Sequence, residues 1–346
     1  MAAAEWLEKM KPVIAVVMLQ VGSAGMDVIS KVALNEGMSN YVFVVYRHAV
    51  ATLLISPFAL LLDRGSRPEM TRSIFTKISA LGLLEPVINQ NLYFLGMKYT
   101  TATFAAAIVN ILPALTFLMA FIIGLEKVRM KSIHSKAKVL GTIATVAGAM
   151  VMTLIKGSAF EQDVAAGGGG SAPVAESHSF MKGGLMMTVG CFSWAGFVIL
   201  QAITLKEYPA DLSLTALICL AGTIEGGIVA LVVEWGRPEA WALGWDTKLL
   251  AAVYSGVVCS GLLFYIQGIV MRERGPVFVT AFNPLCMVLV AIMSSVFLDE
   301  EMFLGRVVGA AIIVAGLYLV VWGKSVDYDN SSATSQENQP LLEERV

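Results

Sequence analysis

The sequence predicts an all-α membrane protein in which ten transmembrane helices form two inverted five-helix repeats. Three observations support this prediction: an apolar composition, ten apolar segments of membrane-spanning length, and a second half that resembles the first. Of the 346 residues, 57% are hydrophobic and only 14% are charged, and the mean hydropathy is +0.73. A soluble domain is about 45–50% apolar and about 25% charged, so this chain has too few polar side chains to cover a soluble core.

Ten segments are long and apolar enough to cross a bilayer, which takes about 20 residues for about 30 Å of hydrocarbon. They are 12–33, 41–62, 77–97, 101–124, 138–156, 182–204, 213–234, 247–269, 277–298 and 304–323. The chain is therefore expected to divide into a cytosolic N-terminus, a first repeat, a flexible linker, a second repeat and a disordered cytosolic tail. The corresponding ranges are 1–11, 12–156, 157–181, 182–323 and 324–346. Glycine and serine at 167–171 give the linker its flexible composition.

Positive charge in the connections predicts the orientation, because Lys and Arg are retained in the cytosol. Ten crossings place both termini on one side, and sixteen of the 24 Lys and Arg residues lie on that side against six on the other. Both termini are therefore expected in the cytosol.

The two halves share short matches in the same order. A shift of 173 residues aligns Asn110 with Asn283, and a shift of 168 aligns Gly141 with Gly309 and Gly148 with Gly316. Because each half has an odd number of spans, the two copies would be inserted in opposite orientations. Inverted repeats are typical of transporters that alternate between inward-open and outward-open states.

Polar side chains within the spans mark the expected substrate cavity, because a charge at the bilayer centre costs at least about 2.5–3.5 kcal/mol. Asp27 and Lys31 share one face of the first span and are also spaced to pair with each other. Hydrogen bonding between helices explains Gln201, Gln267 and Asn283 as well as substrate contact does. The expected cavity residues are Gln20, Asp27, Lys31, Asn89, Gln90, Asn91, Asn110, Gln201, Gln267 and Asn283.

Glu85 is the candidate for proton coupling, because its own helix offers no cation at helical spacing. Pro86, Pro113 and Pro284 are expected to kink their helices. Arg47 and His48 begin about six residues inside their span, roughly 9 Å deep at 1.5 Å per residue. They are expected to reach the membrane surface as anchors.

Several function classes are excluded. No nucleotide-binding loop, zinc motif or nucleophile elbow is found, so no enzyme activity, catalytic residue, metal or cofactor is expected. A net charge of -2 argues against nucleic acid as a partner. The four cysteines, Cys191, Cys219, Cys259 and Cys286, lie in apolar runs and are expected to be small buried hydrophobic residues.

Over residues 10–325 the chain resembles the plant nodulin-like, walls-are-thin-related (UmamiT) branch of the drug/metabolite transporter superfamily. The resemblance implies two five-helix EamA-type repeats and bidirectional, facilitative movement of amino acids across plant membranes. The family usually has an uncharged residue where this chain has Asp27, and often Asp where it has Asn89. The motifs that carry the resemblance are Tyr46-Arg47-His48, Leu84-Glu85-Pro86, Gln90-Asn91-Leu92-Tyr93, Leu112-Pro113-Ala114, Ala252-Val253-Tyr254-Ser255-Gly256, Arg274-Gly275-Pro276-Val277-Phe278, Gly316-Leu317-Tyr318 and Trp322-Gly323-Lys324-Ser325.

The expected function is thus an amino-acid transporter, with amino acids and the lipid bilayer as its partners. Two alternatives stay open: a transporter of auxin or other small organic anions, and a non-transporting membrane receptor or scaffold. The tail matches the acidic dileucine pattern through Glu337, Leu341 and Leu342, which sorting adaptors read. The plasma membrane is the expected location, with the vacuolar membrane as the alternative, and the oligomeric state stays open.

Overall fold

The computed structural model describes residues 2–65, 67–99, 108–126, 133–165, 174–297, 305 and 307–323, and these residues contain helices and no strand. The first half comprises α1 (Ala2–Asn35), α2 (Asn40–Leu62), α3 (Arg72–Gly82), η1 (Leu83–Asn89), α4 (Gln90–Tyr99), α6 (Leu112–Ile122) and α7 (Ile133–Ala165). The second half comprises α8 (Val174–Glu207), α9 (Asp211–Val233), η2 (Pro238–Trp241), α10 (Thr247–Tyr254), η3 (Ser255–Leu263), α11 (Phe264–Arg274), α12 (Pro276–Ala281) and α13 (Asn283–Phe297), followed by a helix at Val307–Gly323.

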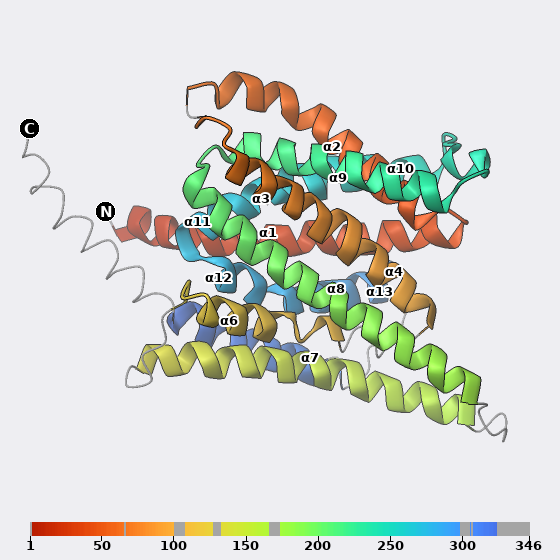
Figure 1. The fold of residues 1–346 in the computed structure, drawn as a ribbon. Coiled ribbons are helices and arrows are strands. Elements are labelled where there is room, and N and C mark those ends of the chain that lie inside the picture. Colours follow the sequence, from red (N-terminus) through yellow and green to blue (C-terminus); the bar gives the residue numbers. More distant parts are fainter. Residues whose placement is uncertain are drawn as a thin grey trace, which may run out of the picture.

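The helices run side by side with alternating direction, as a bundle that crosses a membrane requires (Figure 1). Five helical segments in the described ranges have the length and apolar composition of a membrane span, and three shorter apolar helices accompany them. The outer faces carry large apolar side chains such as Leu53, 77% exposed, and Ile122, 72% exposed. Such an apolar surface fits contact with lipid tails, which need no polar partner. The chain is therefore an all-α membrane protein, as predicted.

The helix bounds differ from the predicted domain boundaries at two places. The first helix already begins at Ala2, inside the range 1–11 expected to be a separate terminus. The helices α7 and α8 reach Ala165 and Val174, so they extend from both sides into the predicted linker 157–181. Glycine and serine fill only the part between them, which lies outside the described residues, as does the tail 324–346.

The third span of each half contains a π-helical segment. In the first half, η1 separates α3 from α4 and contains Pro86, whose ring removes one backbone donor and crowds the preceding turn. In the second half, η3 separates α10 from α11 at the equivalent place. π-helical turns are rare and frequently occur at functional sites. Their presence at equivalent places in both halves makes η1 and η3 candidates for the functional site.

The fourth span of each half is interrupted just before a proline. Asn110 lies in a turn that precedes α6, and Pro113 occupies the first turn of that helix. In the second half, α12 ends at Ala281 and α13 begins at Asn283, with Pro284 as its second residue. Both breaks leave the N-terminus of a short helix within the bundle.

Close glycine contacts show that the two halves are related by a two-fold arrangement. A Cβ on Gly141 would lie 2.7 Å from the Gly316 carbonyl oxygen, and one on Gly148 would lie 2.9 Å from the Gly309 carbonyl oxygen. Gly141 aligns with Gly309 in the sequence and Gly148 with Gly316, so each glycine contacts the equivalent of the other. This crossed pairing is what a two-fold axis between two copies produces.

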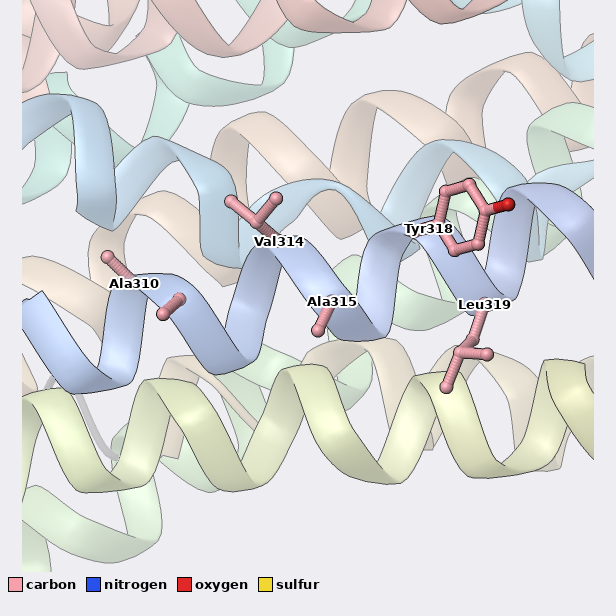
Figure 2. Close-up of a pocket in the computed structure, with 6 residues that line it drawn as sticks. Ala310, Val314, Ala315, Tyr318 and Leu319 are labelled. Atoms are coloured by element: carbon pink, nitrogen blue, oxygen red, sulfur yellow. The ribbon is translucent and has the colours of Figure 1, made fainter.

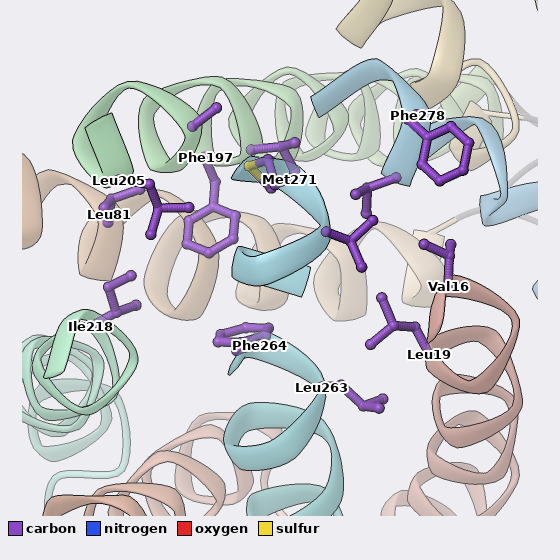
Figure 3. Packing of buried hydrophobic residues seen from close by; sticks show 14 of the residues in the cluster. Val16, Leu19, Leu81, Phe197, Leu205, Ile218, Leu263, Phe264, Met271 and Phe278 are labelled. Carbon is purple, nitrogen blue, oxygen red and sulfur yellow. The ribbon is translucent and has the colours of Figure 1, made fainter. Parts of the chain in front are cut away.

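The main hydrophobic cluster occupies the end of the bundle where α1 begins, called here the N-terminal side. Phe197 of α8 and Phe264 of α11 lie in this cluster with ring centroids 5.7 Å apart and the rings tilted by 40°, and Leu19 of α1 lies in the same cluster near Leu263 (Figure 3). Leu19 precedes Asp27 by eight residues, or about 12 Å along the helix. Apolar side chains therefore fill this part of the bundle around the buried Gln20, Gln201 and Gln267, and Asp27 lies beyond them along α1.

Candidate functional site

Glu85 lies at the centre of a buried polar cluster. It belongs to η1 and its side chain is fully buried. Gln90, one turn along the same span, donates from Nε2 to Glu85 Oε1 over 2.8 Å. Gln90 is one of the expected cavity residues, and in the structure it forms a hydrogen bond to the carboxylate of Glu85.

The basic side chains that face Glu85 come from the neighbouring helix α2. Arg47 Nη2 lies 3.9 Å from Glu85 Oε1, and His48 Nε2 lies 3.4 Å from Glu85 Oε2. Both side chains are buried, with exposed fractions of 2% and 0%. The expectation that they reach the membrane surface as anchors is wrong, because both point into the bundle toward the carboxylate.

Arg47 also links the two halves of the molecule. Its Nε donates to the hydroxyl oxygen of Ser260 over 2.5 Å, and Ser260 belongs to η3. One guanidinium thus lies between the carboxylate of the first π-helical segment and a hydroxyl of the second.

Two glycines allow the backbones to approach closely around this cluster. A Cβ on Gly256 of η3 would lie 2.7 Å from the Arg47 carbonyl oxygen, and one on Gly222 of α9 would lie 2.6 Å from the ring of Pro86. Larger residues at either position would separate α2, η1, η3 and α9. The cluster is therefore held between tightly packed helices.

Asp27 lies apart from this cluster and next to α13. It is exposed although it lies well inside a membrane-spanning helix, so open space adjoins its carboxylate. The Cys286 thiol, in the first turn of α13, donates to Asp27 Oδ2 over 3.8 Å. Cys286 is partly exposed, whereas the other three cysteines are buried as expected. The side chain of Lys31, the expected partner of Asp27, lies outside the described residues.

Other expected cavity residues form hydrogen bonds between helices. Gln267 of α11 donates from Nε2 to Gln201 Oε1 of α8 over 3.0 Å, and both side chains are buried. Asn91 accepts from Asn40 Nδ2 over 3.2 Å and donates to the Val87 carbonyl oxygen over 2.8 Å. The Gln267–Gln201 and Asn40–Asn91 contacts are interhelical hydrogen bonds of the kind that also stabilise membrane helix bundles without a ligand.

The remaining predicted residues occupy separate places. Gln20 and Asn110 are buried, whereas Asn89 and Asn283 are partly exposed at the end of η1 and the start of α13. The structure places Pro86 within η1 and puts Pro113 and Pro284 in the first turns of α6 and α13. Glu337, Leu341 and Leu342 of the sorting motif lie outside the described residues.

A surface groove runs along the helix 307–323, away from all of these groups. It is lined by Ala310, Ala311, Val314, Ala315, Tyr318 and Leu319 (Figure 2). Small and apolar side chains dominate this lining, which offers nothing to bind a charged substrate. The groove fits lipid or another apolar surface better than a polar ligand.

Arg47, His48, Ser260 and Cys286 were not among the candidate site residues chosen from the sequence. Helical spacing reveals neighbours on one helix, and the basic residues that face Glu85 come from another helix. One signal was available: a carboxylate without a partner on its own span and two basic residues deep in the preceding span together suggest a pair.

Comparison with known proteins agrees with this architecture. The EamA-like transporter family matches twice, over residues 10–154 and 181–322, which are the two halves. WAT1-related protein At2g37460 of Arabidopsis thaliana is 60% identical over 341 residues, covering 97% of this chain and 90% of the relative. WAT1-related protein At2g39510 of the same plant is 56% identical, covering 96% of this chain and 90% of the relative. One solved crystal structure superposes with a TM-score of 0.67 at 18% identity, covering 90% of this chain and 96% of that one, and shares the fold.

Proposed function

Because the chain belongs to the EamA-like transporter family and to its WAT1-related branch, we propose that it carries amino acids across a membrane by alternating access. Transport is expected in both directions and to be facilitative. The family consists of transporters, which argues against an enzyme and against the alternative of a non-transporting receptor or scaffold. The chain is an integral, multi-pass membrane protein.

The observation that carries the amino-acid proposal is the exposed carboxylate of Asp27 beside the first turn of α13. An amino acid is a zwitterion, so its site needs an anion for the ammonium group and donors for the carboxylate. Asp27 provides the anion. The first turn of α13 carries the positive end of the helix dipole, and the thiol of Cys286 in that turn lies 3.8 Å from Asp27 Oδ2.

The apolar cluster on the N-terminal side supports alternating access. Phe197, Phe264 and Leu19 close that end of the bundle, while Asp27, deeper along α1, has open space beside it. A site that opens toward one side only is what one state of an alternating-access carrier requires. Movement of the two repeats against each other would open the closed end.

The same geometry argues against auxin or another organic anion as the main substrate. Such a ligand needs an accessible cation, and Arg47, whose guanidinium contacts Ser260 and faces Glu85, is buried. Competition of indole acids with labelled amino acids measures this alternative directly.

We propose that both termini face the cytosol, on the basis of the positive charge in the connections. The proposed membrane is the plasma membrane, and the vacuolar membrane is the alternative. Microscopy of a fluorescent fusion decides between them. A fusion in which Leu341 and Leu342 are replaced by alanine tests whether sorting adaptors read the tail.

Uptake and efflux of a panel of labelled amino acids in oocytes test the proposed function, with Asp27→Asn as the main variant. We expect wild-type transport to depend on the ammonium group, and Asp27→Asn to raise KM by about tenfold or more because the charge that meets it is gone. Asp27→Glu retains the charge and serves as the matched control. Transport of no amino acid by the wild type, or equal KM values for wild type and Asp27→Asn, contradicts the proposal.

A further inference from the structure

His48 and Glu85 face each other across a helix interface, at a distance that one shared hydrogen can bridge. His48 Nε2 and Glu85 Oε2 are 3.4 Å apart, and both side chains are fully buried. Among the residues that the structure describes, neither atom has a hydrogen-bond partner. Buried polar atoms are usually paired, so two such atoms facing each other need an explanation.

The other ring nitrogen of His48 shows which atom can hold that proton. His48 Nδ1 lies 2.8 Å from the Val44 carbonyl oxygen, and a carbonyl oxygen only accepts. Nδ1 therefore carries a hydrogen in every state, and Nε2 carries one only when the ring is an imidazolium. With neither group protonated, a nitrogen lone pair would face a carboxylate oxygen, which is repulsive.

The surrounding groups favour placing the proton on His48. Arg47 is permanently cationic and, with Gln90, faces Glu85 Oε1, which stabilises the ionised carboxylate. A charged carboxylate beside Nε2 in turn stabilises the imidazolium. Polar or titratable groups on the elements around the pair include Asp27 of α1, Ser193 of α8, Cys219 and Glu225 of α9, and Cys259 and Ser260 of η3.

We propose that His48 and Glu85 form a proton-binding site whose loaded form is an imidazolium–carboxylate pair, and that its occupancy controls how tightly Glu85 holds Arg47. When the proton is bound, two cations share one carboxylate, and the attraction between Glu85 and Arg47 weakens. When it has left, Arg47 is the cation that remains. Arg47 also contacts η3 in the second repeat, so the proton acts on a link between the two moving halves.

This inference rests on the proposed function for its effect on transport, but the proton site itself is measurable without transport. The chain has three histidines, so nitrogen NMR of protein with ¹⁵N-labelled histidine in nanodiscs gives a simple spectrum. His48→Gln assigns the His48 signals. We expect them to show an imidazolium, with hydrogens on both ring nitrogens, at low pH and the Nδ1–H tautomer once the proton has left.

Glu85→Gln tests the pairing in the same spectrum, and His134→Gln is the matched control. At a pH where wild-type His48 is mostly imidazolium, Glu85→Gln should reduce that population several-fold, because the neighbouring anion is gone. His134 contacts the ring of Trp322 in another part of the bundle, so its replacement should leave the His48 signals unchanged. A His48 that stays neutral throughout, or that ignores Glu85→Gln, overturns the proposal.

Transport of labelled amino acids at several pH values tests the coupling. The wild type should show a pH-dependent rate over the range in which His48 titrates, and His48→Gln should make the rate at least several-fold less sensitive to pH. A pH dependence that survives in His48→Gln overturns the coupling, even if transport itself is normal. If no amino acid is transported, the proposed function fails, and the NMR titration still decides whether the proton site exists.

Discussion

Arg47 of the first repeat donates from Nε to the hydroxyl oxygen of Ser260 in the second repeat over 2.5 Å. Both side chains are buried, and the same guanidinium faces Glu85. The two π-helical segments, η1 and η3, are therefore joined through one side chain. In a carrier whose repeats move against each other, such a link is a place where a local change acts on both halves.

Ser260→Ala removes the acceptor of this link. We expect a loss of about 1–3 kcal/mol in stability, because a buried charged donor is left without its partner, together with slower transport. Thermal unfolding in detergent and initial transport rates measure the two effects.

Ser255→Ala is the matched control in the same π-helical segment. Ser255 is equally buried, but its hydroxyl donates to the Ala251 carbonyl oxygen of its own helix over 2.5 Å. Its loss should cost little and leave transport unchanged. If both variants behave alike, the Arg47–Ser260 contact has no special role.

Hydropathy and internal matches were enough to predict most of the fold. The apolar segments correspond to the helices, and the matched glycines Gly141 and Gly309 lie in equivalent helices of the two halves. The π-helical segments were not predictable to the same degree. Pro86 signals a break in η1, but η3 contains no proline that would mark it in the sequence.

The candidate site was less predictable, because helical periodicity does not show which residues form hydrogen bonds between helices. Gln201 and Gln267 were chosen for their polarity, and the structure pairs them with each other. Glu85 was chosen because its own helix offers no cation, and the structure supplies Arg47 and His48 from α2. Polarity within a span identifies residues that need a partner, and only the packing of the helices determines which partner they find.

The Gln201–Gln267 pair is expected to stabilise the bundle and not to select the substrate. Gln267→Leu should lower the free energy of unfolding by roughly 0.6–2 kcal/mol, because the buried amide of Gln201 loses its hydrogen-bond partner. The double variant Gln201→Leu/Gln267→Leu should cost less than the sum of the single variants. Unfolding of all four proteins completes the cycle, and a change in the order of preferred substrates would show that the pair contacts the substrate.

Gly316→Ala should separate the last helix from α7. The added Cβ would lie 2.7 Å from the Thr145 backbone nitrogen, and overpacking of this kind costs typically about 1–3 kcal/mol. Gly227→Ala is the control, since a Cβ there meets no atom within 4 Å. We expect a clearly lower unfolding temperature for Gly316→Ala alone, and equal values for the two variants would contradict the close helix contact.

Cys286 provides a chemical probe of the space beside Asp27. It is partly exposed and its thiol lies 3.8 Å from Asp27 Oδ2, whereas Cys191, Cys219 and Cys259 are buried. A methanethiosulfonate reagent with a trimethylammonium group should modify Cys286 and stop transport, because the cation is attracted to Asp27. A reagent of similar size with a sulfonate group should react more slowly for the opposite reason.

Excess amino acid should slow this modification, because the substrate would occupy the same space. Cys286→Ser retains a hydroxyl that can donate to Asp27, so it should transport normally and resist the reagent, while Cys191→Ser should stay as sensitive as the wild type. Inhibition that persists in Cys286→Ser would place the reactive thiol elsewhere. A bound amino acid at Asp27 must shield a thiol this close to the Asp27 carboxylate. Modification of Cys286 at the same rate with and without substrate would therefore show that the substrate does not bind at Asp27.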